Sequence, residues 1–305
     1  MQQIFTDPAH QNAFEDNGFT VIRLMSGEEA TSLHGQIDAS GLGKGFARNS
    51  ENPYHATYFD DDKAYRREAY AFARGAIAER AAPLLCGYRM ITGGFVVKHP
   101  GDGPVPLHRD WTLTDDAGRV TLNFWLPLVD ADENNGAMRL VPGSARLVPN
   151  IETAHVDSYF TPFGEAVKGI STVIPVKAGE ALVFDSAVLH WSDENRSARA
   201  RPAILATWIP EDCRTVFYSL DRQAEGRRFA LVDMDGDGLI DHTSEQLAAG
   251  DYERPTIGFV ENRNRPVSQR EFERLLACRR RQEEGGRGSG RGLLREVYRR
   301  LTAAA

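Results

Sequence analysis

The stretch Val120-Thr-Leu-Asn-Phe-Trp-Leu126 decides the predicted fold, because aliphatic and aromatic residues alternate with more polar ones along it. A period of two is typical of a half-buried β-strand. Turn residues follow it, as at Asn135-Gly136 and Pro142-Gly143-Ser144. From about residue 88 onward the chain is therefore expected to form several short strands, the others at 174–176, 181–184 and 203–208.

Helical patterns precede these strands. Ser26 and Glu29 have the spacing of a capping box, so a short amphipathic helix is expected to follow Ser26. A second helix is expected to begin near Asp62, and Pro83 interrupts its pattern. Helices followed by many short strands predict an α+β protein built on an antiparallel sandwich or barrel.

The composition is that of an ordinary globular protein, and we expect that it is not exported. The chain has 305 residues, of which 41% are apolar and 26% are charged. No apolar run approaches a membrane span, and the amino-terminal residues lack the pattern of a signal peptide. The three cysteines, Cys86, Cys213 and Cys278, lie far apart and fit reduced thiols. We expect a cytoplasmic protein with no membrane partner, and the net charge of −7 argues against a nucleic-acid partner.

The carboxyl-terminal end differs from the rest of the chain in charge. From Pro266 onward there are ten arginines and five glutamates, a local charge of +5. The glycine-rich segment 282–291 predicts a flexible linker, and residues 293–301 predict a short basic amphipathic helix. Such a run is usually a solvated helix face. Otherwise this tail is a candidate contact for homo-oligomer formation or for an acidic protein partner.

The segment Pro106-Leu-His108-Arg-Asp110-Trp111 is the main chemical signal. Residues two apart on a strand project from the same face, so His108 and Asp110 can reach one point in space. A second histidine, His190, ends an apolar segment and opens a polar loop. Two histidines and one carboxylate form a facial triad, which leaves positions on Fe(II) for a bidentate cosubstrate and for O₂. For either histidine alone, a structural role or a zinc site would be preferred.

A dianionic cosubstrate needs a cation at its far end, and an arginine pairs a carboxylate through two parallel hydrogen bonds. Arg199 and Arg201 follow His190 and would face the same side of the next strand. The residues alone leave the choice between these two arginines open.

Together these motifs resemble the phytanoyl-CoA dioxygenase-like (PhyH) family of Fe(II)/2-oxoglutarate-dependent oxygenases, which also includes ectoine hydroxylases. The resemblance covers roughly residues 10–210. It begins at Phe14-Glu-Asp-Asn-Gly-Phe-Thr-Val-Ile22 and continues through the segment from His108 to Trp111 and the turns at 135–136 and 142–144. It closes with His190-x-Ser192-x-x-Asn195-x-Ser197-x-x-x-Arg201.

The family resemblance implies a double-stranded β-helix (jelly roll, cupin-like) with helices packed on one side. It implies His108, Asp110 and His190 as iron ligands and Arg201 as the arginine that binds 2-oxoglutarate. Ser192 matches a hydroxyl that assists this arginine, and Trp125 lies near the position of an aromatic residue beside the cosubstrate. Related halogenases have a small residue in place of Asp110, so its carboxylate favours hydroxylation or another oxidation such as desaturation.

Three parts of the chain are expected from the extent of this resemblance and from the composition of the tail. These are an oxygenase domain with amino-terminal helices at 1–212, an extension packed on the core at 213–281 and a basic linker with a short helix at 282–305. The expected function is oxidation of an unactivated carbon in a metabolite or natural-product intermediate, with succinate and CO₂ as coproducts. The alternatives are a cupin-like metal isomerase or hydrolase and a non-catalytic jelly-roll protein that binds a small molecule.

Weaker candidates lie elsewhere. Residues 233–241 resemble the start of an EF-hand loop, but Ser244 stands where the bidentate glutamate is needed, so a hairpin turn between 229–232 and 239–240 is favoured. Trp111 and Trp191 each follow an iron-ligand candidate and are expected to point away from the metal into the core. Three residues are expected either beside the substrate pocket or in exposed loops: Lys98, His99 and His155.

Overall fold

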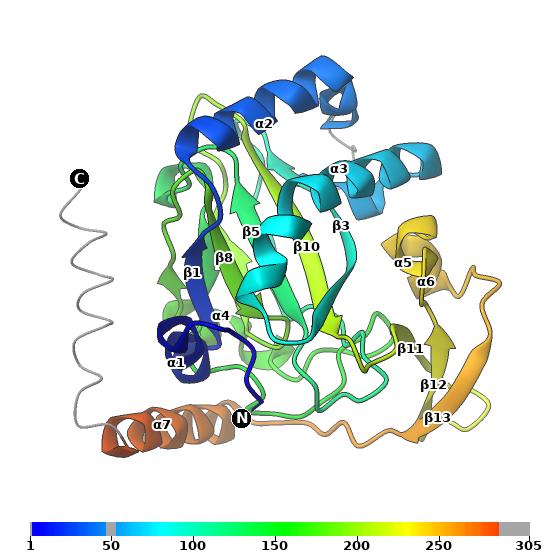
Figure 1. Ribbon diagram of the computed structural model, residues 1–305. Coiled ribbons are helices and arrows are strands. Elements are labelled where there is room, and N and C mark those ends of the chain that lie inside the picture. Colours follow the sequence, from blue (N-terminus) through cyan, green and yellow to red (C-terminus); the bar gives the residue numbers. More distant parts are fainter. Residues whose placement is uncertain (1, 47–52, 287–305) are drawn as a thin grey trace.

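The computed structural model describes residues 2–46 and 53–286. Its centre is a six-stranded antiparallel sheet in the order β1-β8-β5-β10-β3-β2 (Figure 1). The strands are β1 (Phe19–Arg23), β2 (His55–Ala56), β3 (Tyr88–Lys98), β5 (Leu122–Pro127), β8 (Glu180–Asp185) and β10 (Arg201–Pro210). A second, four-stranded sheet has the order β4-β9-β6-β7. It contains β4 (Val105–His108), β6 (Met138–Leu140), β7 (Thr172–Val173) and β9 (His190–Ser192).

Three helices precede or interrupt the first strands of the large sheet: α1 (Pro8–Asn17), α2 (Gly27–Ser40) and α3 (Lys63–Ala81). The expected capping box between Ser26 and Glu29 is present at the start of α2. Asp62 caps α3 by accepting hydrogen bonds from the backbone N–H groups of Ala64 and Tyr65. Both expected helices are thereby confirmed. α1 was not anticipated, since it buries one large apolar residue, Phe14, and so has little helical periodicity.

Strand β5 shows how the large sheet is buried. Leu122, Phe124 and Leu126 pack in one cluster with residues of α2 and α3. Trp125 points to the opposite face and packs with Met138 and Leu140 of the small sheet. The half-buried strand predicted at 120–126 is therefore a strand with two buried faces, because helices cover one face and a second sheet covers the other.

The strands expected at 181–184 and 203–208 are confirmed as β8 and β10. The strand expected at 174–176 is wrong, because β7 ends at Val173 and Val176 makes only an isolated bridge to Ala131. Pro175 lies between them and has no N–H group to donate to a strand ladder.

Beyond β10 the chain builds a three-stranded sheet in the order β11-β12-β13, with two short helices beside it. These elements are β11 (Val216–Leu220), β12 (Arg228–Asp233), β13 (Thr256–Glu261), α5 (Gly238–Asp241) and α6 (Ser244–Ala249). The remaining short helices are η1 (Leu42–Phe46), η2 (Thr57–Phe59), η3 (Ala82–Leu84), η4 (Glu133–Asn135), η5 (Thr161–Phe163) and α4 (Gly164–Gly169).

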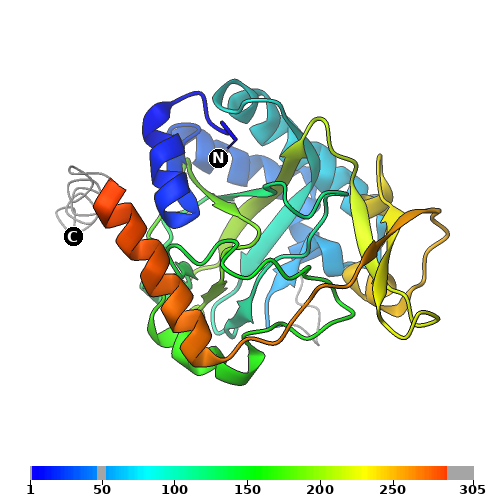
Figure 2. The ribbon, with the colours of Figure 1, turned by 90° about the horizontal axis from the view of Figure 1, so that it is seen from below.

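The last described element is α7 (Gln269–Gly286), which runs beside α1 on the underside of the molecule (Figure 2). Phe272 and Leu276 bury its apolar side against Tyr159 and Phe163. The first residues of the expected linker, 282–286, are helical here, whereas the remaining tail lies outside the described residues. Within the part of the chain that the structure covers, no helix has both the length and the apolar character needed to cross a membrane.

The hairpin turn favoured between 229–232 and 239–240 is wrong, because Leu239 and Ile240 lie in α5. The acidic residues of this segment are held by basic side chains. Asp235 pairs with Arg89 at 2.7 Å, and Asp241 pairs with Arg67 at 2.9 Å. These carboxylates therefore point to separate arginines, and calcium binding stays the alternative that the sequence disfavoured.

Candidate metal centre and active site

The candidate metal ligands converge at one end of the small sheet. His108 is the last residue of β4, His190 is the first residue of β9, and the two are directly paired across the strands. Asp110 lies in the loop after β4, outside any strand, where its backbone N–H donates to the Ser186 carbonyl at 3.0 Å. His190 begins a strand instead of ending one, because a tight turn separates it from β8. One ligand atom from each of the three residues lies within 4.8 Å of the others.

The two imidazoles present the same nitrogen to this point. Nδ1 of His108 lies 2.7 Å from the Pro106 carbonyl, and Nδ1 of His190 lies 2.9 Å from the Val188 carbonyl. A carbonyl can only accept, so Nδ1 carries the hydrogen and the Nε2 lone pair is free to bind a metal. Burial and the neighbouring His108 lower the pKa of His190 to about 4. His190 is therefore neutral near pH 7, as a metal ligand must be.

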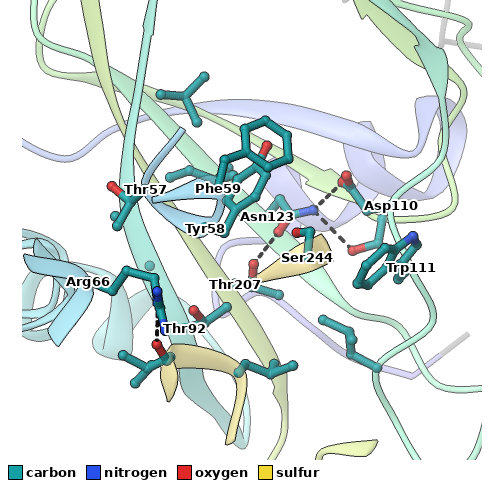
Figure 3. Close-up of a pocket in the computed structure, with 18 of the residues that line it drawn as sticks. Thr57, Tyr58, Phe59, Arg66, Thr92, Asp110, Trp111, Asn123, Thr207 and Ser244 are labelled. Atoms are coloured by element: carbon teal, nitrogen blue, oxygen red, sulfur yellow. Dashed lines mark hydrogen bonds between the residues drawn. The ribbon is translucent and has the colours of Figure 1, made fainter. Parts of the chain in front are cut away.

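Asp110 is held by a chain of polar side chains from the large sheet (Figure 3). Asn123 Nδ2 donates to Asp110 Oδ2 at 2.6 Å, and Asn123 Oδ1 accepts a hydrogen bond from Thr207 Oγ1 at 2.7 Å. Burial opposes ionisation of Asp110, but the neighbouring His190 and His108 outweigh it and hold its pKa below the usual value. Asn123 and Thr207 are site residues that the motifs did not reveal; their signal in the sequence is a polar residue inside an otherwise apolar strand.

The two arginines that the sequence could not separate lie in different environments. Arg199 is exposed, whereas Arg201 begins β10 and is 2% exposed. Nε and Nη1 of Arg201 are buried and have no hydrogen-bond partner among the described residues. Its guanidinium carbon lies 4.9 Å from the centre of the Trp125 ring. A buried guanidinium with unused donors fits a carboxylate, because unsatisfied buried donors are costly.

Ser192 lies on the same strand as His190, and Lys98 lies beside Arg201. Ser192 is buried in β9, two residues after His190. Lys98 ends β3 and is directly paired with Arg201. Lys98 is completely buried and donates a hydrogen bond to the Asp193 carbonyl, so it is not an exposed loop residue.

The remaining sequence candidates lie elsewhere. His99 contacts the Phe46 carbonyl at 2.6 Å, and His155 packs on Phe217 of the carboxyl-terminal extension. Trp191 is half-buried, with its Nε1 donating to Ser171, so it is not a core residue. Trp111 was expected to point away from the metal, but it lines the same cavity as Asp110. The alternation rule failed there because this segment has left the strand.

A cavity of about 300 Å³ opens beside the candidate ligands. Its walls come from η2, α3, β3, the loop after β4, and α5 and α6 of the extension (Figure 3). Residues far apart in the chain, from Tyr54 to Leu247, thus line the space next to Asp110.

The sequence pattern that describes the phytanoyl-CoA dioxygenase (PhyH) family matches residues 14–203. The chain belongs to this family. The resemblance seen in the sequence is thereby confirmed. The segment of the phytanoyl-CoA dioxygenase family includes His108, Asp110, His190 and Arg201, and it ends before the carboxyl-terminal extension.

Curated relatives share a smaller segment with this family member. The dioxygenase aneA of Aspergillus aculeatus is 31% identical over 121 residues, which cover 37% of this chain and 37% of that protein. The dioxygenase FUM3 of Gibberella moniliformis is 30% identical over 115 residues, which cover 35% of this chain and 34% of that protein. The chain thus matches little more than a third of the length of these relatives.

Solved structures of similar fold are more distant in sequence. The non-haem α-ketoglutarate-dependent carbocyclase SnoK from nogalamycin biosynthesis is 19% identical, with a TM-score of 0.52 over 70% of this chain and 90% of that chain. The epimerase SnoN in complex with Fe³⁺, α-ketoglutarate and nogalamycin RO is 20% identical, with a TM-score of 0.52 over 68% and 87%. These similarities confirm a fold of helices and antiparallel sheets.

Proposed function

We propose that the protein is an Fe(II)- and 2-oxoglutarate-dependent oxygenase with iron held by His108, Asp110 and His190. The observation that carries the proposal is the approach of their three ligand atoms within 4.8 Å, on one side of a cavity. Two histidines and one carboxylate leave positions open for a bidentate cosubstrate and O₂. Bound iron and 2-oxoglutarate would supply oxidation of an unactivated carbon, with succinate and CO₂ as coproducts.

The residues of this chain would hold and orient the reactants. Arg201 would bind the distal carboxylate of 2-oxoglutarate through its unused donors, with Ser192 assisting and the Trp125 ring packed on the guanidinium. Asn123 would fix the orientation of Asp110. The carboxylate of Asp110 occupies the position that a small residue has in related halogenases, which supports hydroxylation or desaturation.

The substrate would be a small metabolite or a natural-product intermediate. The relatives are named as dioxygenases, and SnoK and SnoN come from nogalamycin biosynthesis, which supports this class of substrate.

A direct test separates this function from a zinc isomerase, a hydrolase or an inert binding protein. Iron-loaded protein with 2-oxoglutarate under argon should show the weak visible charge-transfer band of a chelated keto acid. On admission of O₂ it should form succinate slowly without substrate. If the protein gives no band and forms no succinate at saturating 2-oxoglutarate, the oxygenase assignment is wrong.

We further propose that the two larger sheets form a double-stranded β-helix, because they enclose one apolar cluster that contains Trp125 and Met138. The proposed divisions are an oxygenase domain at 1–212, an extension at 213–281 and a basic tail at 282–305. A crystal structure tests these divisions.

We also propose that the protein is cytoplasmic, which cell fractionation tests. The basic tail is proposed to mediate self-association or to bind an acidic partner. Analytical ultracentrifugation of the full chain tests the self-association.

A further inference from the structure

The cavity beside Asp110 is lined mainly by apolar and hydroxyl-bearing side chains. Aromatic rings come from Tyr54, Tyr58, Phe59, Phe95 and Trp111, and aliphatic groups come from Leu205, Leu239, Ile240 and Leu247. The polar lining combines hydroxyl groups, such as those of Thr92 and Ser244, with His242, whose Nδ1 lies 2.8 Å from the Gly238 carbonyl, and with residues of the candidate metal centre. No lysine or glutamate lines this space among the residues that the structure covers.

The two arginines that reach the cavity are already engaged. Arg66 is 4% exposed and donates to the backbone carbonyls of Asp60, Ile240 and Asp241. Arg109 is buried and forms an ion pair with Glu152 at 2.7 Å. An anionic substrate would therefore have to displace the carbonyl partners of Arg66 or the carboxylate partner of Arg109 to bind a cation in this cavity.

Part of the cavity wall comes from the carboxyl-terminal extension. Ile240 of α5 and Leu247 of α6 line the same space as Asp110 and Trp111. Arg66 fixes this wall, because its hydrogen bonds to Ile240 and Asp241 measure 2.8 and 2.7 Å. The wall is thus attached to α3 and is not an independent flap.

We propose that the substrate is an uncharged, mainly apolar small molecule and that Leu247 limits its size. This inference rests on the proposed function for the reaction, but it concerns recognition by the cavity alone. Hydroxyl or carbonyl groups on the substrate can pair with the lining hydroxyl groups, while its apolar body packs against the rings. Acyl thioesters with charged carriers and free amino acids do not fit this lining.

Binding of matched probes tests the charge preference without turnover. The full chain, loaded with Fe(II) and 2-oxoglutarate under argon and separately freed of metal, is titrated with fused-ring alcohols of two to four rings. Each alcohol is compared with the carboxylate of the same ring system, and binding is followed by calorimetry. We expect at least one alcohol to bind at least tenfold more tightly than its carboxylate in both forms. A carboxylate that binds the metal-free protein as tightly, or a panel in which no alcohol binds, overturns the proposal.

Variants of α6 test the size limit. Leu247→Trp should lower the affinity for the largest alcohol that binds by at least tenfold. It should lower the affinity for the two-ring alcohol much less. Leu247→Ala should admit larger ring systems than the wild-type protein does. Ala249→Trp is the control, because Ala249 is exposed on the same helix. Unchanged selectivity in both Leu247 variants, with the native circular dichroism spectrum, contradicts the assignment. Absence of succinate in wild-type protein would instead count against the proposed reaction.

Discussion

Lys98 and Arg201 occupy directly paired positions on β3 and β10, and both side chains are almost completely buried. Two buried cations on neighbouring strands are unfavourable unless an anion joins them. Burial and the charge of Arg201 lower the pKa of Lys98 to about 7. Burial also lowers the pKa of Arg201, to about 10. This pairing is the electrostatic environment expected for a bound dianion.

The affinity for 2-oxoglutarate should fall as the pH rises above about 7. Below this pH Lys98 is charged in the free protein, and an adjacent dianion would raise its pKa further. Above it, binding must take up a proton, so the dissociation constant should increase by up to about tenfold per pH unit. Anaerobic calorimetry between pH 6 and 9 measures this slope. Lys98→Met should bind more weakly at pH 6.5 and lose the slope, whereas an unchanged slope would show that another group titrates.

Arg201→Ala should weaken the binding of 2-oxoglutarate by roughly 2–3 kcal/mol, which is about a hundredfold in affinity. This size of effect is typical for the loss of a charge-assisted pair. Metal binding should survive, since Arg201 is not a candidate ligand. Arg199→Ala is the control, because Arg199 is exposed in the same loop region. Comparable losses in the two variants would mean that the effect is one of overall charge.

His190→Ala should abolish tight divalent-metal binding, because a site with three protein ligands cannot lose one without a large loss of affinity. Metal content after dialysis and the keto-acid charge-transfer band should disappear together. His155→Ala removes a histidine that packs on the extension and should leave both unchanged. Full iron occupancy and turnover in His190→Ala would contradict the ligand assignment.

Asn123→Leu should lower metal affinity by about 10- to 100-fold, the usual effect of removing a partner that orients a ligand. Thr207→Val should have a smaller effect, because Thr207 contacts Asp110 only through Asn123. Metal titration in competition with a chelator gives both values. If Asn123→Leu altered thermal stability but not metal affinity, Asn123 would be a structural residue and not a positioning residue for Asp110.

Short-range patterns predicted the starts of α2 and α3, the strands β5, β8 and β10, and the candidate ligands. The capping box at Ser26 and the spacing of His108 and Asp110 depend on a few adjacent residues, so the sequence alone displays them. The Asn123–Thr207 contact depends on the register between β5 and β10, where these residues are directly paired. Strand register follows from the assembled sheet, which a single sequence does not determine.

The cavity wall could not be predicted for a related reason. Arg66 and Ile240 are separated by 174 positions, and the sequence gives no sign that they meet. The segment 233–241 was judged as an isolated loop motif, but its structure is set by Arg66, Arg67 and Arg89 from distant parts of the chain.

The hydrogen bonds between Arg66 and α5 have a consequence for how the cavity wall can change. The ligands that would hold the metal lie within the family segment, whereas Leu239, Ile240 and Leu247 lie beyond it. Changes in the carboxyl-terminal region would therefore reshape the cavity wall while leaving the proposed metal ligands unchanged. Arg66 donates hydrogen bonds to backbone carbonyls, which every residue type provides. It can therefore hold a carboxyl-terminal extension whose side chains differ from those of this chain. The attachment of α5 to α3 would therefore tolerate changes in the side chains of the cavity wall.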